Sequence, residues 1–133
     1  MYNVAIVGGG PAGIFTALEI TKLKPDWKIL LIEKGSKIEK RKCPLREGVK
    51  QCLSCKTCGL LCGWGGAGAF SDGKLTLTPE VGGHLVDYMP YKDVEDLIEY
   101  CDNIYLEHGA TTTVFGTNKA DFADIEHAAT LAE

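Results

Sequence analysis

Residues Tyr2–Glu33 read YNVAIVGGGPAGIFTALEITKLKPDWKILLIE, and this stretch predicts the fold. It begins with a short apolar run that leads directly into a glycine-rich turn, Gly8–Gly13. Apolar residues at helical spacing follow, and Pro25 ends them. A second apolar run, Ile29–Ile32, then closes on an acidic residue. The order strand, turn, helix, strand predicts a βαβ unit with parallel strands.

The glycines of the turn follow the spacing G-x-G-x-x-G, and each has its own physical role. Gly8 allows a sharp turn off the strand, Gly10 lets the backbone approach a phosphate without a Cβ, and Gly13 lets the helix pack closely on the sheet. Pro11 and Ala12 begin the helix, where a missing N–H costs little and the free N–H groups favour negative charge. The turn therefore predicts a site for the pyrophosphate of a dinucleotide.

Glu33 stands 20 residues after Gly13, at the carboxyl end of the second predicted strand. An acidic side chain there accepts hydrogen bonds from a ribose 2′-hydroxyl and repels a 2′-phosphate, so NADP is disfavoured at this site. The residues of the fingerprint do not choose between NAD and FAD. An ordinary βαβ unit with a glycine-rich turn and no ligand is the alternative interpretation.

The fingerprint also resembles a known family. Val7–Ile14, closing on Glu33 and Lys34, looks like the N-terminal FAD-binding segment of flavoproteins of the glutathione-reductase type. Later residues narrow the resemblance to FAD-dependent dehydrogenases, also described as NAD(P)/FAD-dependent oxidoreductases. The resemblance implies FAD as the cofactor, with Lys34 beside Glu33 at its binding site.

A second glycine-rich block, Gly65–Lys74, carries most of that narrower resemblance. It is similar to a G-G-x-G-x-x-S-D-G-K segment that follows a cysteine-rich loop in the family. Small residues allow the backbone to come close to a flat ligand. The resemblance implies that the following residues lie against the cofactor on its flavin side: Gly66, Ala67, Gly68, Ser71 and Asp72. A flexible glycine-rich loop is the alternative.

Composition sets the broad class of the protein. At 133 residues, with 45% apolar side chains and a net charge of −4, the chain has the composition of one globular domain. Residues 34–50 carry seven bases against two acids, and residues 80–133 carry twelve acids against two bases. Solvated faces explain both runs. A sharper interpretation places one or more of four bases near the phosphates of the cofactor, because the basic run follows the strand end that carries Glu33; these bases are Lys40, Arg41, Lys42 and Arg46. Because no aromatic residues interleave the basic run, we expect no nucleic-acid binding.

The amino-terminal residues carry no targeting signal. The first apolar run begins at Tyr2, which leaves no room for the charged and apolar regions of a signal peptide. No apolar run approaches the roughly 18 residues of a transmembrane helix. We therefore expect a cytoplasmic protein without a membrane partner, whose cysteines are thiols or metal ligands rather than structural disulfides.

The cysteines form a second informative group. Four of them, Cys52, Cys55, Cys58 and Cys62, follow the spacing C-x-x-C-x-x-C-x-x-x-C. This is the spacing of a bacterial ferredoxin run, although Gly63 stands where that run has proline. In two-cluster ferredoxins the fourth cysteine serves the other cluster, so Cys43 or Cys101 is an alternative fourth ligand. An iron–sulfur cluster, a structural zinc site and thiols without metal are three interpretations that the residues leave open.

The rest of the chain predicts secondary structure rather than chemistry. Alternation over Lys74–Thr78 predicts a strand. Apolar residues at helical spacing between positions 90 and 108 predict a core-facing helix, with Gly109 as its C-cap. The residues of that face are Val94, Leu97, Ile98, Cys101, Ile104 and Tyr105. Thr111–Phe115 predicts a short strand, and Asp121–Glu133 predicts a further helix.

These observations predict an α/β fold. We expect a Rossmann-like, FAD-binding βαβ unit with a cysteine-rich and glycine-rich loop insertion, additional helices and an incomplete doubly wound sheet. The βαβ unit spans residues 1–35, the loop region 36–74, and a strand and helix extension 75–133, all in the N-terminal portion of one FAD-binding domain. Because the chain ends inside a predicted helix, we expect the C-terminal part of the same protein to complete the site.

The resemblance implies a flavin-dependent oxidoreductase, a dehydrogenase that acts on a small-molecule substrate. NAD(P)H is a candidate electron donor, and an iron–sulfur centre in the cysteine loop is a candidate one-electron partner. The sequence indicates no catalytic acid or base, and we expect the 133 residues alone to be inactive. Two alternatives stay open: an NAD-binding dehydrogenase half, which the Gly65–Asp72 block argues against, and a non-enzymatic metal-binding or interaction module.

Overall fold

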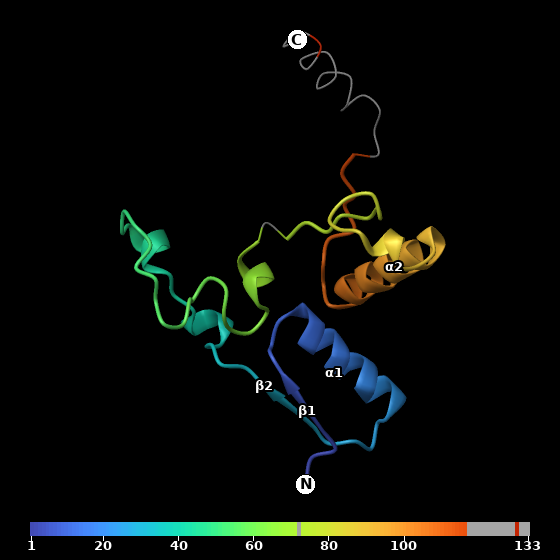
Figure 1. Cartoon of the computed structure of the whole chain (residues 1–133), viewed down its shortest axis with the longest axis horizontal. Helices are drawn as coiled ribbons and strands as arrows, with labels where there is room; N and C mark the ends of the chain where they lie inside the picture. The colour runs from blue at the N-terminus through green and yellow to red at the C-terminus, as the bar shows by residue number, and fades with distance from the viewer. Residues whose placement is uncertain (72, 117–129, 131–133) are drawn as a thin grey trace. The chain divides into compact units, whose positions relative to one another are not determined.

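The computed structural model describes residues 1–71, 73–116 and 130, and Figure 1 shows the order of their elements along the chain. The chain divides into two compact units, Met1–Lys74 and Leu75–Glu133. The first unit holds a small parallel sheet and one helix, and the second holds a longer helix. The fold is therefore mixed α/β, as predicted.

The first unit begins with the predicted strand–helix–strand arrangement. Strand β1 (Val4–Val7) and strand β2 (Ile29–Ile32) are parallel neighbours, with Val4 opposite Ile29 and Val7 opposite Ile32. Helix α1 (Pro11–Leu23) connects them and contacts both strands (Figure 1). Within the described residues the sheet has two strands, so the predicted doubly wound sheet stays a prediction.

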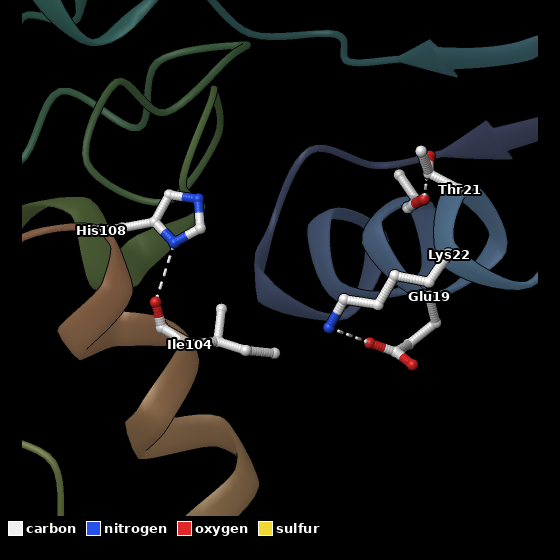
Figure 2. Close-up of polar contacts among 6 residues, drawn as sticks. Glu19, Thr21, Lys22, Ile104 and His108 are labelled. Carbon is white, nitrogen blue, oxygen red and sulfur yellow. Dashed lines mark hydrogen bonds and ion pairs between the residues drawn. The ribbon is translucent and has the colours of Figure 1, made fainter. Parts of the chain in front are cut away.

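The ends of α1 follow local sequence signals. Gly10 is the N-cap and Pro11 occupies the first turn, where its lack of an N–H costs little. The helix ends at Leu23, with Lys24 as C-cap, directly before Pro25. Two polar contacts lie near this end (Figure 2): the Thr21 hydroxyl donates to the carbonyl of Ala17 at 2.8 Å, and Lys22 pairs with Glu19 at 3.4 Å.

Apolar side chains of the βαβ unit are only partly covered. In helix α1 the apolar residues at helical spacing are half-buried at Ile14, Ala17, Leu18 and Ile20, while Thr21 and Leu23 are exposed. No residue of α1 is fully buried. At the carboxyl ends of the strands, Val7 is 84% exposed and Ile32 is 47% exposed.

Short turns of 3₁₀-helix, and no longer elements, are found among the described residues of the segment 34–74. These turns are η1 (Ile38–Lys40), η2 (Pro44–Glu47) and η3 (Ala67–Phe70). The segment is held by close backbone contacts: a Cβ added to Gly35 would lie 2.5 Å from the nitrogen of Gly63, and one added to Gly59 would clash with the carbonyl oxygen of Lys42. Residues 35–42 and 59–63 therefore pack directly on each other.

The second unit is built on helix α2 (Tyr91–Glu107), which confirms the predicted helix. A 3₁₀ turn, η4 (Leu85–Asp87), precedes and contacts it. Of the predicted apolar face, Val94 and Ile104 are buried, Ile98 and Cys101 are half-buried, and Leu97 and Tyr105 are exposed. The four residues that are at least half-buried, Val94, Ile98, Cys101 and Ile104, are spaced three or four positions apart and form one row along the helix. The covered face is therefore narrower than the apolar pattern predicts.

Left-handed backbone ends α2. The C-cap is His108, whose ring nitrogen Nδ1 lies 2.8 Å from the carbonyl oxygen of Ile104 (Figure 2). Gly109 follows the cap with φ +94°, a conformation that glycine adopts without the penalty of a Cβ. The prediction of Gly109 at the helix end is thus correct within one position.

Two predicted strands are wrong. Lys74–Thr78 and Thr111–Phe115 are both irregular, with no strand among their residues. Their threonines satisfy nearby backbone N–H groups instead: Thr78 accepts from Glu80 at 3.3 Å, and Thr111 accepts from Thr113 at 3.1 Å. Such local bonds compete with a strand ladder. The predicted helix at Asp121–Glu133 lies outside the described residues except for position 130.

No helix within the described residues is long and apolar enough to cross a membrane.

Candidate functional site

The glycine turn has the geometry that its spacing predicts. Gly8 leaves β1 with φ +112°, and its N–H donates to the carbonyl of Ile32 at 2.7 Å, which keeps the two strand ends together. A Cβ added to Gly13 would clash with the carbonyl oxygen of Gly8 and would lie 3.4 Å from Cγ2 of Ile6. Gly13 is therefore required for close packing of α1 on β1.

Gly10 differs from Gly13, because space is open around it. Its φ is −82°, which any residue adopts, and a Cβ added there would come no closer to another group than 3.9 Å from the Cα of Gly66. The fold does not need a glycine at this position. The open space in front of the first turn of α1 is the place where a phosphate would approach the backbone.

Glu33 connects the end of β2 to the glycine turn. Its Oε2 accepts a hydrogen bond from the N–H of Gly9 at 2.7 Å, and its Oε1 accepts one from the N–H of Gly35 at 2.8 Å. These two bonds lower the pKa of the Glu33 carboxyl, because they favour its charged form. Each carboxylate oxygen has two lone pairs, so the half-buried group keeps acceptor capacity for a ribose hydroxyl.

The second glycine block lies directly against the first. The N–H of Gly65 donates to the carbonyl of Gly9 at 2.8 Å. A Cβ added to Gly66 would lie 3.2 Å from the Cα of Gly10 and 3.4 Å from Cδ of Pro11. Gly66 has φ +62°, which is itself unfavourable for any other residue. The structure thus brings Gly66 to the N-terminus of α1. The predicted contact of Gly66 with the cofactor stays a prediction.

The remaining residues of the second block continue away from this contact. Ala67 and Gly68 form the start of η3, and Ser71 is its C-cap. The Ser71 hydroxyl accepts from the N–H of Gly73 at 3.1 Å. Asp72 lies outside the described residues. Contact of these side chains with a flavin stays a prediction, as does the contact of Lys34, which is exposed.

Arg41 is a buried residue of the first unit, with 7% of its surface exposed. Its guanidinium donates to four backbone carbonyl oxygens, those of Gly59 at 2.9 Å, Leu60 at 2.7 Å, Trp64 at 2.8 Å and Gly66 at 2.7 Å. The same group lies 4.7 Å from the centre of the Phe70 ring. These bonds use four of the five guanidinium N–H donors. Direct contact between Arg41 and a phosphate stays a prediction.

The sequence patterns did not indicate this role of Arg41. A basic run is ordinarily a solvated face, and nothing in its composition marks the one member that is buried. The sequence feature that could have indicated a buried arginine is the set of glycines at positions 35, 59 and 63. A Cβ on Gly63 would lie 2.6 Å from Cδ of Arg41 and 2.6 Å from the carbonyl oxygen of Ser36. These glycines make room for the arginine and for the backbone around it.

The cysteines of the loop do not form a metal centre in this structure. Among the described residues, no three His, Cys, Asp or Glu side chains come together as metal ligands. All six cysteines are free thiols; Cys52 and Cys55 are exposed, while Cys43, Cys58, Cys62 and Cys101 are half-buried. As arranged here, the four-cysteine run does not fit an iron–sulfur or zinc site. Metal binding by Cys52, Cys55, Cys58 and Cys62 stays a prediction.

Comparison with known proteins shows partial likeness to two curated proteins. An uncharacterised protein of Clostridium beijerinckii is 41% identical over 71 residues, which is 53% of this chain and 13% of that protein. L-2-hydroxyglutarate dehydrogenase, mitochondrial, of Dictyostelium discoideum is 40% identical over 52 residues, which is 39% of this chain and 12% of that protein. The aligned residues thus span about an eighth of each relative. No family model matches the chain, and no solved structure matches it.

Proposed function

We propose that this chain is the FAD-binding part of a flavin-dependent oxidoreductase, a dehydrogenase. The observation that carries the proposal is the contact between the two glycine blocks, with Gly66 against Gly10 at the start of α1. The partial likeness to a protein named as a dehydrogenase supports the same reaction class. The activity, a small-molecule substrate and NAD(P)H as electron donor are proposals for the whole protein.

The geometry of the described residues supports the proposal of a dinucleotide site. The pyrophosphate would rest at Gly8, Gly10 and Gly13, where the first N–H groups of α1 are available and the Cβ-free position at Gly10 leaves space. The adenosine ribose would bind the carboxylate of Glu33. FAD, when bound, supplies the redox chemistry, and the protein binds it, orients it and limits its access to water.

The second glycine block would line the cofactor beyond the pyrophosphate. Gly66 lies at the N-terminus of α1, so Ala67 and Gly68, which follow it directly, are the next residues along the ligand. We place Ser71 and Asp72 on the flavin side by the family resemblance. We also propose that further strands, from the C-terminal part of the same protein, cover β1 and β2, because Val7 and Ile32 are exposed.

The alternatives make different predictions. An NAD-binding dehydrogenase half would use the same turn and Glu33, but would have no need for a second glycine block against Gly10. A metal-binding module would depend on the cysteine loop, whose thiols do not converge here. We keep an iron–sulfur centre as a secondary proposal, because it requires the loop to rearrange around the cluster.

The test is the affinity of the full 133-residue chain for FAD and for NAD⁺, measured by fluorescence titration for the wild type and for Gly10→Ala. The added methyl makes only an ordinary contact with Gly66, so the fold persists, but it occupies the approach to the pyrophosphate. We expect the Kd for FAD to rise about tenfold or more, which is roughly 1.4 kcal/mol or more.

The matched control is Thr21→Ala, at the opposite end of the same helix, where only the bond to Ala17 is lost. It should bind FAD like the wild type. Tight NAD⁺ binding without FAD binding would favour the NAD alternative. If the wild type and Gly10→Ala bind FAD with equal affinity, the glycine turn does not contact the cofactor, and the proposed site is wrong at this position.

A further inference from the structure

A continuous chain of hydrogen bonds connects Arg41 to the glycine turn. Its Nη1 donates to the carbonyl of Trp64 at 2.8 Å. The N–H of the same peptide unit, which belongs to Gly65, donates to the carbonyl of Gly9 at 2.8 Å. In a planar trans peptide the C=O and N–H point in opposite directions. A guanidinium that holds the carbonyl therefore also aims the N–H at Gly9.

The N–H of Gly9 is held as well, by a different residue. Its N–H donates to Oε2 of Glu33 at 2.7 Å. Gly9 is thus fixed between a carboxylate and, through one peptide unit, a guanidinium. Hydrogen bonds in such a chain polarise one another, and those that involve a charged group are the strongest.

Arg41 makes a second contact with the same segment. The same Nη1 donates to the carbonyl of Gly66 at 2.7 Å, and Gly66 is the residue that lies against Gly10 and Pro11. Nη1 of Arg41 therefore binds two carbonyls, those of Trp64 and Gly66, which lie before and after Gly65 in the chain. These two bonds fix the backbone of the second glycine block where it contacts the first. The Phe70 ring, 4.7 Å from the guanidinium, limits its movement.

We propose that Arg41 is a positioning residue for the proposed FAD site, because its guanidinium holds the Trp64 and Gly66 carbonyls so that the second glycine block closes on Gly9 and Gly10. This inference rests on the proposed function. It differs from direct phosphate contact, because Arg41 acts through the backbone and its charge lies inside the loop. A lysine cannot replace it, because an ammonium lacks the planar fork that reaches several carbonyls at once.

The test uses Arg41→Ala and Arg41→Lys in the full chain, with two measurements. The first is amide hydrogen exchange without any nucleotide, compared at Gly65 and at the amides of α1. The second is FAD affinity by fluorescence titration. In both variants we expect faster exchange at Gly65, unchanged protection in α1, and FAD affinity lower by about tenfold or more, because the second glycine block no longer stays closed.

Arg46→Ala is the matched control. Arg46 also lies over the Phe70 ring, 5.3 Å from its centre. Within the part of the chain that the structure describes, the side-chain hydrogen bonds to the carbonyls of Gly59, Leu60, Trp64 and Gly66 come from Arg41 and not from Arg46. It should behave like the wild type in both measurements. A loss in this variant equal to that in Arg41→Ala would overturn the proposal, because general loss of positive charge would then explain both.

The remaining outcomes separate the inference from the proposed function. If the wild type does not bind FAD, the proposed function fails, and the positioning role fails with it, whatever Gly65 does. If the wild type binds FAD and Arg41→Lys binds it equally well, only the positioning role fails. If both Arg41 variants lose protection in α1 as well as at Gly65, Arg41 is a residue of general stability and the positioning role is overturned.

Discussion

Glu33 shows how one carboxylate serves both the fold and the proposed site. Its two oxygens accept from Gly9 and Gly35, and these bonds lower its pKa. Its position at the end of the second strand predicts a hydrogen bond with a ribose hydroxyl. The structure adds a second role, in which Glu33 holds the glycine turn before any ligand is present.

The lowered pKa of Glu33 predicts a pH dependence of stability. The unfolded chain binds a proton at a higher pH than the folded chain, so the contribution of Glu33 is fully present above the ordinary glutamate pKa, about 4.3, and is lost as pH falls through the lowered folded-state value. In Glu33→Gln the urea-unfolding midpoint should depend less on pH across that acidic window. We expect a modest difference, because solvent screens the half-buried group. Glu39→Gln is the control and should keep the pH dependence of the wild type. If the midpoint of Glu33→Gln changes with pH as steeply as that of the wild type, Glu33 is not the group that causes this dependence.

Elements of the βαβ unit depend on Gly13 for their packing. Gly13→Ala would push the Cβ into the carbonyl oxygen of Gly8, and the backbone cannot yield cheaply there. We expect a loss of about 1–3 kcal/mol in the free energy of unfolding, typical of overpacking, measured by urea denaturation. Gly68→Ala is the control, because its Cβ would meet nothing within 4 Å. Equal stability of the two variants would show that α1 does not pack on β1 in this way.

The elements that sequence predicted correctly are those with strong local signals. Glycines and a proline bound α1, and an apolar row with a glycine after it defines α2. The two wrongly predicted strands, Lys74–Thr78 and Thr111–Phe115, show an alternating pattern of side chains but have no partner strand among the described residues. Strand pairing depends on the whole fold, and a local sequence pattern does not contain that information.

The site was predictable in part for the same reason. The roles of Gly8 and Gly13 follow from spacing that acts over a few residues. The buried Arg41, by contrast, depends on carbonyls 18 to 25 positions away, and no local pattern specifies those partners.

At the scale of the whole molecule, the proposed site belongs to one of two units. All proposed cofactor residues fall within Met1–Lys74, whereas the buried pair Val94 and Ile104 lies in the second unit. The residues aligned with the two curated relatives span about an eighth of each relative.

The most direct test of the central claim is the visible absorption spectrum of the 133-residue chain after incubation with FAD and gel filtration. A chain that holds the dinucleotide at the glycine turn and Glu33 elutes with flavin absorbance in its protein peak, and Gly10→Ala elutes with much less. A folded chain that elutes colourless, with all flavin in the small-molecule fraction, would contradict the claim that these residues form an FAD site.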